Sequence, residues 1–410
     1  MATGNSIGVR GIGIVSPGAI GMEPFAARLW ESRSAIAPIE RFDVSELRSK
    51  RAALIEGFKP REFIAQMKMR RMNTLSRLGM SAMRLALTDA GMESPRVSGA
   101  AAGVAIGTTF GPVQTSVEYL NEYIQKGAAL APPQLFAESV ANAPGSHIAI
   151  EWGFRGFNLT FTQRESSTMA ALLFAATQLN KGTAEAAVVG GVEEMNDITF
   201  SVLDRIGALA HEAGDVKEAC RPYDRDRNGL MVGEGAAVFL LESLTSGSQE
   251  SVYGIVSGFG IAKDPTASIS NWGTGDDAVS RAMASAIEDA GLEPDQIDAI
   301  WGSANSSIPC DRLEYRAIQR FFGGAIPPVV ATKGLFGEYA AAGGLHLATA
   351  LLALREQRLP ASAGFVRGED EMMLEVTRVT RDAELRHILV NSLSAGGGVI
   401  CAVLSRADHA

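Results

Sequence analysis

Two helical segments rich in small residues constrain the fold of this chain most strongly. One spans residues 168–181, follows a strand-like stretch at 157–161, and is rich in alanine. The other spans residues 337–354 and is also rich in alanine and glycine. Small residues let another backbone approach closely, so we expect the two helices to pack against each other at the centre of the fold.

Strands alternate with helices around each of these segments. In the first half, strands are predicted at 6–15, 102–107, 157–161 and 186–191, and a long apolar strand ends near 242. In the second half, strands are predicted at 252–260, 297–302, 329–332, 361–365, 388–392 and 399–404. This alternation predicts two similar, mostly parallel α/β units. The polar segment 243–251 is the best candidate linker, which gives an N-terminal half at 1–245 and a C-terminal half at 252–410.

Composition excludes several classes of function. The 410 residues are 46% apolar and 20% charged, which is ordinary for a globular protein. The formal charge of −9 argues against a nucleic-acid surface. There is no signal sequence and no apolar run long enough to cross a membrane, and Cys220, Cys310 and Cys401 lack metal-ligand spacing. We therefore expect a cytoplasmic chain with reduced cysteines and neither a metal site nor a membrane partner.

A glycine-rich stretch at 11–18 is superficially similar to a dinucleotide-binding loop. Ser16 stands where that fingerprint has its third glycine, and Pro17 interrupts the helix that should follow. No nicotinamide or other cofactor is therefore expected.

Four segments, taken together and in order, resemble the β-ketoacyl-acyl-carrier-protein synthases of the thiolase fold. The most specific is Arg221-Pro-Tyr-Asp-Arg-Asp-Arg-Asn-Gly, which continues to Gly233-Glu-Gly. The segments 298–311, 332–337 and 391–397 are similar to three further family blocks. The resemblance runs from about Val9 to Leu404. It implies an α/β thiolase fold in which two similar αβαβα halves form a five-layered core.

The catalytic positions of that family are all replaced in this chain. The nucleophilic cysteine falls on Glu165, at the turn between the strand-like stretch and the first small-residue-rich helix. The first catalytic histidine falls on Ser303, and the second falls on Glu338, directly after Lys333-Gly-Leu-Phe-Gly337.

Three supporting charged positions of the family are retained. They are Lys333, Asp311 and Glu314. The phenylalanine gate that the family carries near its C-terminal glycines falls on Ala395.

These replacements remove the groups that condensation needs. A ketosynthase holds the growing chain on a thiolate and uses imidazoles to stabilise the enolate formed when malonyl loses CO₂. A carboxylate at Glu165 could form only a reactive anhydride. We expect this pocket to be inactive in condensation, and we do not expect Cys220 or Cys310 to replace the nucleophile.

Two interpretations of Glu165 remain open. In the first, Glu165 is ionised, its pKa is lowered by the helix N-terminus, and it pairs with Lys333; such an anion stabilises a helix by roughly 0.3–1 kcal/mol. In the second, burial keeps Glu165 protonated, and it polarises a malonyl thioester during decarboxylation. We predict the first.

A ketosynthase-like chain without its nucleophile resembles the chain-length factor, or ketosynthase β subunit, of type II polyketide systems. The resemblance implies a heterodimer with a cysteine-containing ketosynthase α subunit, a tunnel for a growing polyketide or polyene, and acyl carrier protein as client. One alternative is a stand-alone homodimeric enzyme that decarboxylates malonyl carrier protein or transfers acyl groups. Another is a homodimeric acyl-binding or regulatory protein.

Three segments are candidates for contacts with these partners. Thr115 and Ser116 fall where the family limits acyl length, unless they are ordinary residues of a helix N-terminus. Lys68, Arg70 and Arg71 are candidates for carrier-protein docking, and the alternative is a solvated helix face. The apolar segment 132–143 is a candidate subunit contact.

Overall fold

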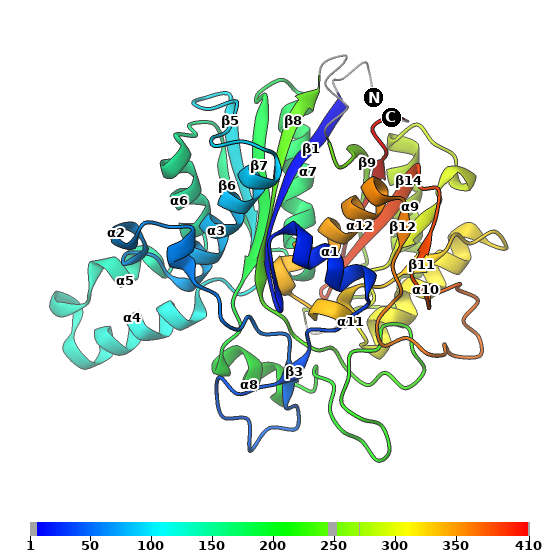
Figure 1. Ribbon diagram of the computed structural model, residues 1–410. Helices are drawn as coiled ribbons and strands as arrows, with labels where there is room; N and C mark the ends of the chain where they lie inside the picture. Colours follow the sequence, from blue (N-terminus) through cyan, green and yellow to red (C-terminus); the bar gives the residue numbers. More distant parts are fainter. Residues whose placement is uncertain (1–5, 245–251, 270, 409–410) are drawn as a thin grey trace.

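A computed structural model describes residues 6–244, 252–269 and 271–408 of the chain (Figure 1). Most of the predicted linker, residues 245–251, lies outside the described residues. The division of the chain at 245 and 252 therefore stays a prediction.

The two halves have the same strand order. In the N-terminal half, neighbouring strands run β1 (Ser6–Ser16), β8 (Gly235–Leu244), β7 (Ala186–Glu193), β5 (Ala102–Gly107) and β6 (Asn158–Phe161). In the C-terminal half they run β9 (Ile255–Lys263), β15 (Gly398–Ser405), β14 (His387–Ser394), β10 (Ala299–Trp301) and β11 (Val329–Val330). Both follow the order first, fifth, fourth, second, third along the chain. A short antiparallel pairing of β1 with β9, at Ile7–Val256 and Gly8–Ile255, joins the halves.

Helices pack on the outside of each half and between the halves. Helices α3 (Thr74–Asp89) and α6 (Ala143–Trp152) belong to one outer layer, and α9 (Asp276–Asp289) and α10 (Ile308–Phe322) belong to the other (Figure 1). Helices α7 (Ser167–Asn180) and α12 (Gly344–Glu356) share one apolar cluster with residues of both halves of the sheet. These three apolar clusters hold together five layers, namely outer helices, one half of the sheet, central helices, the other half of the sheet and outer helices, which confirms the predicted thiolase fold.

The remaining elements are short or peripheral. The helices are α1 (Met22–Trp30), α2 (Gln66–Met69), α4 (Val113–Lys126), α5 (Pro133–Glu138), α8 (Asp197–Arg205) and α11 (Lys333–Phe336). The strands are β2 (Ala19–Ile20), β3 (Ala37–Pro38), β4 (Arg51–Ala52), β12 (Arg358–Leu359) and β13 (Arg381–Asp382). Single 3₁₀ turns lie at Pro60–Glu62, Ala128–Leu130, Arg164–Ser166, Pro294–Gln296 and Ala340–Gly343.

Small residues are required where the central layer meets the sheet. A Cβ atom on Gly191 of β7 would lie 1.9 Å from the carbonyl oxygen of Ala341. That same carbonyl accepts a hydrogen bond from the Thr168 hydroxyl at 2.9 Å, which ties α7 to the turn before α12. Because the neighbouring atoms are backbone, they cannot move aside for a side chain. Small residues at these positions therefore allow β7 and α7 of the N-terminal half to pack directly against the turn before α12 of the C-terminal half.

Three sequence predictions of regular structure are wrong. The second central helix begins at Gly344, because Tyr339, Ala341 and Ala342 have φ values of +65°, +51° and +50°, which a right-handed helix does not allow. The strand predicted at 361–365 is a loop whose contact with its neighbour includes one backbone hydrogen bond, from Ser362 N to Thr377 O. The first of these changes matters for function, since the turn at 337–343 carries Glu338 and Tyr339 to the candidate site.

The third wrong prediction is that each half is mostly parallel. Strand β8 pairs antiparallel with β1 and β7, and β15 pairs antiparallel with β9 and β14. The outer pairs, β7–β5–β6 and β14–β10–β11, are parallel. Each half is therefore a mixed sheet.

Candidate functional site at the turn before α7

The turn between β6 and α7 presents Glu165, as the sequence predicts. Arg164 has a φ of +52°, a left-handed conformation that costs free energy in a non-glycine residue. The Arg164 carbonyl accepts hydrogen bonds from the Thr109 hydroxyl at 3.0 Å and the Ser167 hydroxyl at 2.7 Å, and these hold the turn. The Glu165 side chain points inward, and the residue is 2% exposed.

The carboxylate of Glu165 has neutral hydrogen-bond donors. Tyr339 donates from its hydroxyl to Oε1 at 3.1 Å, and the backbone N–H of Ala395 donates to Oε2 at 3.1 Å. The guanidinium of Arg164 is farther away, with Nε 3.8 Å from Oε2. Burial and the nearby Glu338 carboxylate raise the pKa of Glu165 to about 7. The predicted lowering of this pKa by the helix N-terminus is wrong, because loss of solvation outweighs the helix dipole.

Lys333 pairs with Glu338, so the predicted Glu165–Lys333 ion pair is wrong. The Lys333 ammonium lies 2.8 Å from Glu338 Oε2 and 2.7 Å from the Ser303 carbonyl oxygen. Burial alone would lower the pKa of Lys333, but the Glu338 carboxylate raises it above its ordinary value. Asn305 also donates to Glu338 Oε2 at 2.8 Å. A buried ion pair therefore occupies the position that the sequence resemblance assigns to the second family histidine.

Glu314 holds the segment around Ser303, the position that the sequence resemblance assigns to the first family histidine. It accepts hydrogen bonds from the backbone N–H of Ser303 at 2.7 Å, the Tyr223 hydroxyl at 2.6 Å and the Asn391 amide at 2.9 Å. The Ser303 hydroxyl in turn accepts from the Leu393 backbone N–H at 2.9 Å. Ser303 is thus fixed by its neighbours.

Asp311 connects the charged loop at 221–229 to the same cluster. Its carboxylate accepts from the backbone N–H groups of Tyr223 at 2.7 Å and Asn305 at 2.9 Å, and lies 3.4 Å from Arg227 Nε. Burial raises the pKa of Asp311 to about 7, although Arg227 opposes the shift. The structure therefore brings Glu165, Ser303, Glu338 and the three retained charged residues into one buried cluster.

Several members of the cluster were not found from the sequence. Tyr339, Asn305 and Asn391 each donate to one of its carboxylates. Tyr339 directly follows Glu338, but nothing in the sequence shows that the chain turns back toward Glu165 there. Only the left-handed turn at 339–342 produces that contact.

The cysteines are poorly suited to nucleophilic chemistry. Cys220, Cys310 and Cys401 are buried free thiols. Burial raises the pKa of each thiol above its ordinary value, so the reactive thiolate is disfavoured. This agrees with the prediction that Cys220 and Cys310 do not replace the lost nucleophile.

The candidate tunnel residues lie in two different places. Thr115 is buried in the first turn of α4, and the Ser116 hydroxyl lies 2.9 Å from Pro112 O and 3.2 Å from Ser139 O. Ala395 lies instead beside Glu165, to which its backbone N–H donates a hydrogen bond. The role of all three residues in a tunnel stays a prediction.

The candidate docking residues are exposed on and beside α2. Lys68 pairs with Glu151, whereas Arg70 and Arg71 have no charged side-chain partner in the described part of the chain. A groove of about 580 Å³ adjoins them and is lined by residues 61–66 and Met69. The groove is compatible with docking, but the role of the three cations stays a prediction.

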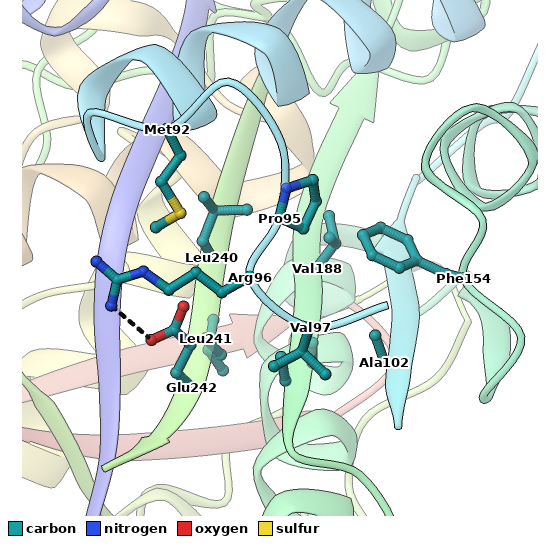
Figure 2. Close-up of a pocket in the computed structure, with 12 residues that line it drawn as sticks. Met92, Pro95, Arg96, Val97, Ala102, Phe154, Val188, Leu240, Leu241 and Glu242 are labelled. Carbon is teal, nitrogen blue, oxygen red and sulfur yellow. Dashed lines mark ion pairs between the residues drawn. The ribbon is translucent and has the colours of Figure 1, made fainter. Parts of the chain in front are cut away.

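Little free space remains at the candidate site. The cavity lined by Lys333, Glu338 and Tyr339 has a volume of about 10 Å³, which is at the limit for one water. Figure 2 shows another cavity, between segment 92–97 and strands β7 and β8, where Arg96 lies 3.8 Å from Glu242. Its volume of about 20 Å³ is also too small for any ligand larger than about one water molecule. Neither cavity accommodates an acyl chain as it stands.

Comparison with known proteins identifies the family to which this chain belongs. Residues 4–246 match the family model described as beta-ketoacyl synthase, N-terminal domain. Residues 253–366 match beta-ketoacyl synthase, C-terminal domain. The chain belongs to the β-ketoacyl synthase family.

The relatives include proteins named as 3-oxoacyl-[acyl-carrier-protein] synthases and as polyketide beta-ketoacyl synthases. The chain is 28% identical over 400 residues to 3-oxoacyl-[acyl-carrier-protein] synthase 2 of Vibrio cholerae, covering 95% of this chain and 96% of that protein. It is 28% identical over 365 residues to the actinorhodin polyketide putative beta-ketoacyl synthase 2 of Streptomyces coelicolor, covering 88% of each. A solved structure of the ishigamide ketosynthase/chain length factor has a TM-score of 0.87 and 26% identity, covering 98% of this chain and 99% of that one.

Within the described residues, no helix is both long and apolar enough to span a membrane.

Proposed function

We propose that this chain is a chain-length factor, the catalytically inactive partner of a cysteine-containing ketosynthase α subunit. The observation that carries the proposal is the closed cluster around Glu165, Ser303 and Glu338. The cluster holds no thiolate and no imidazole at these positions, and its polar atoms are engaged with one another. The partner supplies acyl transfer and condensation, and this chain shapes the tunnel for a polyketide or polyene carried on acyl carrier protein in the cytoplasm.

One side of the N-terminal half supports the proposed heterodimer. Strand β6 is the last strand of the sheet in the described chain, so one backbone edge has no strand partner. Helices α4, α5 and α6 lie on the same side (Figure 1). Large apolar side chains are exposed on these elements: Leu120, Ile124, Phe136, Ile150 and Leu159. An unpaired edge beside exposed apolar side chains favours association with another chain. Helix α5 falls within the predicted subunit contact at 132–143.

Co-expression with a cysteine-containing ketosynthase tests this function. We expect a heterodimer by native mass spectrometry, and acyl product only when both chains are present. The chain alone, incubated with malonyl carrier protein, should release CO₂ no faster than buffer does. Steady CO₂ release that Glu165→Ala abolishes would contradict the proposal.

One observation favours the stand-alone enzyme as a second candidate. Since the pKa of Glu165 is about 7, the carboxyl group is partly protonated at neutral pH and can donate a hydrogen bond. A protonated carboxyl could polarise a malonyl thioester, but the neighbouring cavity lined by Lys333, Glu338 and Tyr339, at about 10 Å³, is too small to hold one. The CO₂ assay with the purified chain separates the two candidates.

The tunnel interpretation predicts that Ser116→Phe shortens the acyl products of the heterodimer. A phenylalanine in the first turn of α4 would fill space next to Ser139, and the longest products should disappear from the mass spectrum. The matched control is Ser116→Ala, which removes the same hydroxyl without adding bulk and should leave product length unchanged. Products of unchanged length from an intact Ser116→Phe heterodimer would exclude a tunnel wall at this position.

A further inference from the structure

A groove of about 330 Å³ lies on the outer layer of the C-terminal half. One wall is Gly273, Thr274 and Asp276, at the start of α9. The other wall is the first part of α10, with Ile308, Pro309, Arg312, Leu313 and Arg316. This volume falls within the range of natural binding sites. The groove lies outside the closed cluster around Glu165.

Arginines recur at every fourth residue along the exposed side of α10. Arg312, Arg316 and Arg320 therefore lie on one face of the helix. Arg312 lies 3.1 Å from Glu369, and Arg320 lies 3.1 Å from Asp276.

Arg316 differs from its two neighbours because it has no counter-ion. In the described ranges, its guanidinium has neither an ion-pair partner nor a hydrogen-bond partner. Asp276, which lines the groove, is already paired with Arg320. The chain as a whole carries a net charge of −9, whereas this groove presents an arginine whose positive charge is not neutralised by an ion pair. The groove is therefore suited to an incoming anion.

The floor of the groove is apolar. Ile308 is 40% exposed, and Pro309 and Leu313 adjoin it. An apolar floor beside an unpaired arginine is complementary to a helix that carries carboxylates next to an apolar side chain. A free anion such as phosphate would leave the apolar floor uncovered. The occupant that fits both features is an acidic amphipathic helix.

The groove is connected to the candidate site through the loop before α9. Asp264 accepts hydrogen bonds from the backbone N–H groups of Thr266 and Gly275, each at 2.8 Å, which ties the two ends of the loop together. Further along the same loop, the Ile269 carbonyl accepts from the Arg164 guanidinium at 2.7 Å. A partner in the groove would therefore touch the loop that contacts the turn carrying Glu165.

We propose that this groove, between Gly273–Thr274 and the Arg312–Arg316 face of α10, docks an acidic helix of an acyl carrier protein. The proposal rests on the proposed function, which supplies the carrier protein as client. It assigns a docking surface separate from the Lys68, Arg70 and Arg71 candidates on the N-terminal half.

The test measures binding of fluorescently labelled carrier protein to the heterodimer by anisotropy, at low and at high salt. Arg316→Glu should weaken binding roughly tenfold at low salt, since it places a like charge against the acidic helix. The difference should largely disappear at high salt because salt screens exposed charges. Arg316→Lys should retain most of the affinity. Since Arg316 has no partner within the described chain, these changes should leave the melting temperature unaltered.

Lys181→Glu is the matched control, because it makes the same change of charge at an exposed residue after α7, away from the proposed subunit contact. It should bind carrier protein like the unmodified chain. Equal affinities of the Arg316→Glu and Lys181→Glu variants would overturn the groove, as would a loss of binding only on reversing Lys68, Arg70 and Arg71. Failure to form the heterodimer would refute the proposed function instead. Binding of carrier protein to the purified single chain, measured with the same variants, would then test separately whether the groove is a docking site.

Discussion

Replacing Lys333 with methionine should lower the free energy of unfolding by about 3–5 kcal/mol. The ammonium is buried and lies 2.8 Å from Glu338 Oε2. Methionine fills a similar volume but removes the charge. Glu338, which is 1% exposed, then keeps a carboxylate without its counter-ion. Urea denaturation monitored by circular dichroism measures the loss.

A second substitution separates the lost charge from lost packing. In Lys333→Met combined with Glu338→Gln, no buried charge remains unpaired at this position, and much of the stability should return. Lys181→Met, at an exposed residue after α7, is the control and should change stability by less than about 0.5 kcal/mol. A double variant as unstable as Lys333→Met would show that the ion pair is not the cause.

Glu165→Gln should stabilise the chain at pH 8 by up to about 3 kcal/mol, the equivalent of a pKa shift from 4.5 to about 7. Below pH 4.5, Glu165 is protonated in both the folded and the unfolded chain, and its titration contributes nothing. Between pH 4.5 and 7 the unfolded chain loses this proton first, so the stability of the unmodified protein falls as pH rises. Above pH 7 the full cost of the buried carboxylate is present.

Glutamine removes this cost but loses one hydrogen bond, because the Tyr339 hydroxyl no longer has a carboxylate to donate to. Its Oε1 can accept from the Ala395 backbone N–H, and its Nε2 can donate to the Tyr339 hydroxyl oxygen. Thermal unfolding from pH 4 to pH 8 should show a gap between the two proteins that widens with pH. Glu185→Gln, at an exposed residue before β7, serves as control and should give a constant gap near zero. A gap that does not widen with pH would mean that Glu165 titrates normally.

The fold was largely predictable because its signals are local and repeated. Each half alternates strands and helices, and the small-residue-rich segments mark the central layer. The boundary error at 337–343 arose because alanine has the highest helix propensity, and nothing in the run of small residues reveals the left-handed conformations of Tyr339, Ala341 and Ala342.

The positions of the site were predictable, but its electrostatics were not. Motif spacing identified Glu165, Ser303 and Glu338, and the structure brings them into one cluster. The protonation of Glu165 depends on how completely tertiary packing excludes water, and no local pattern encodes this. The choice of Glu338 over Glu165 as the partner of Lys333 depends on a turn that the sequence did not reveal.

The hydrogen bond from the Ala395 backbone to Glu165 has a consequence for evolutionary history. A single reversion of Glu165 to cysteine would leave this N–H and the Tyr339 hydroxyl without their acceptor inside a dry interior, at a cost of roughly 1–3 kcal/mol for each group. Such a variant would also still lack both imidazoles. Selection for catalysis would therefore have to restore several residues together. Each single substitution alone would destabilise the protein or bring no catalytic benefit. Under the proposed function, no single substitution could therefore restore the nucleophilic site.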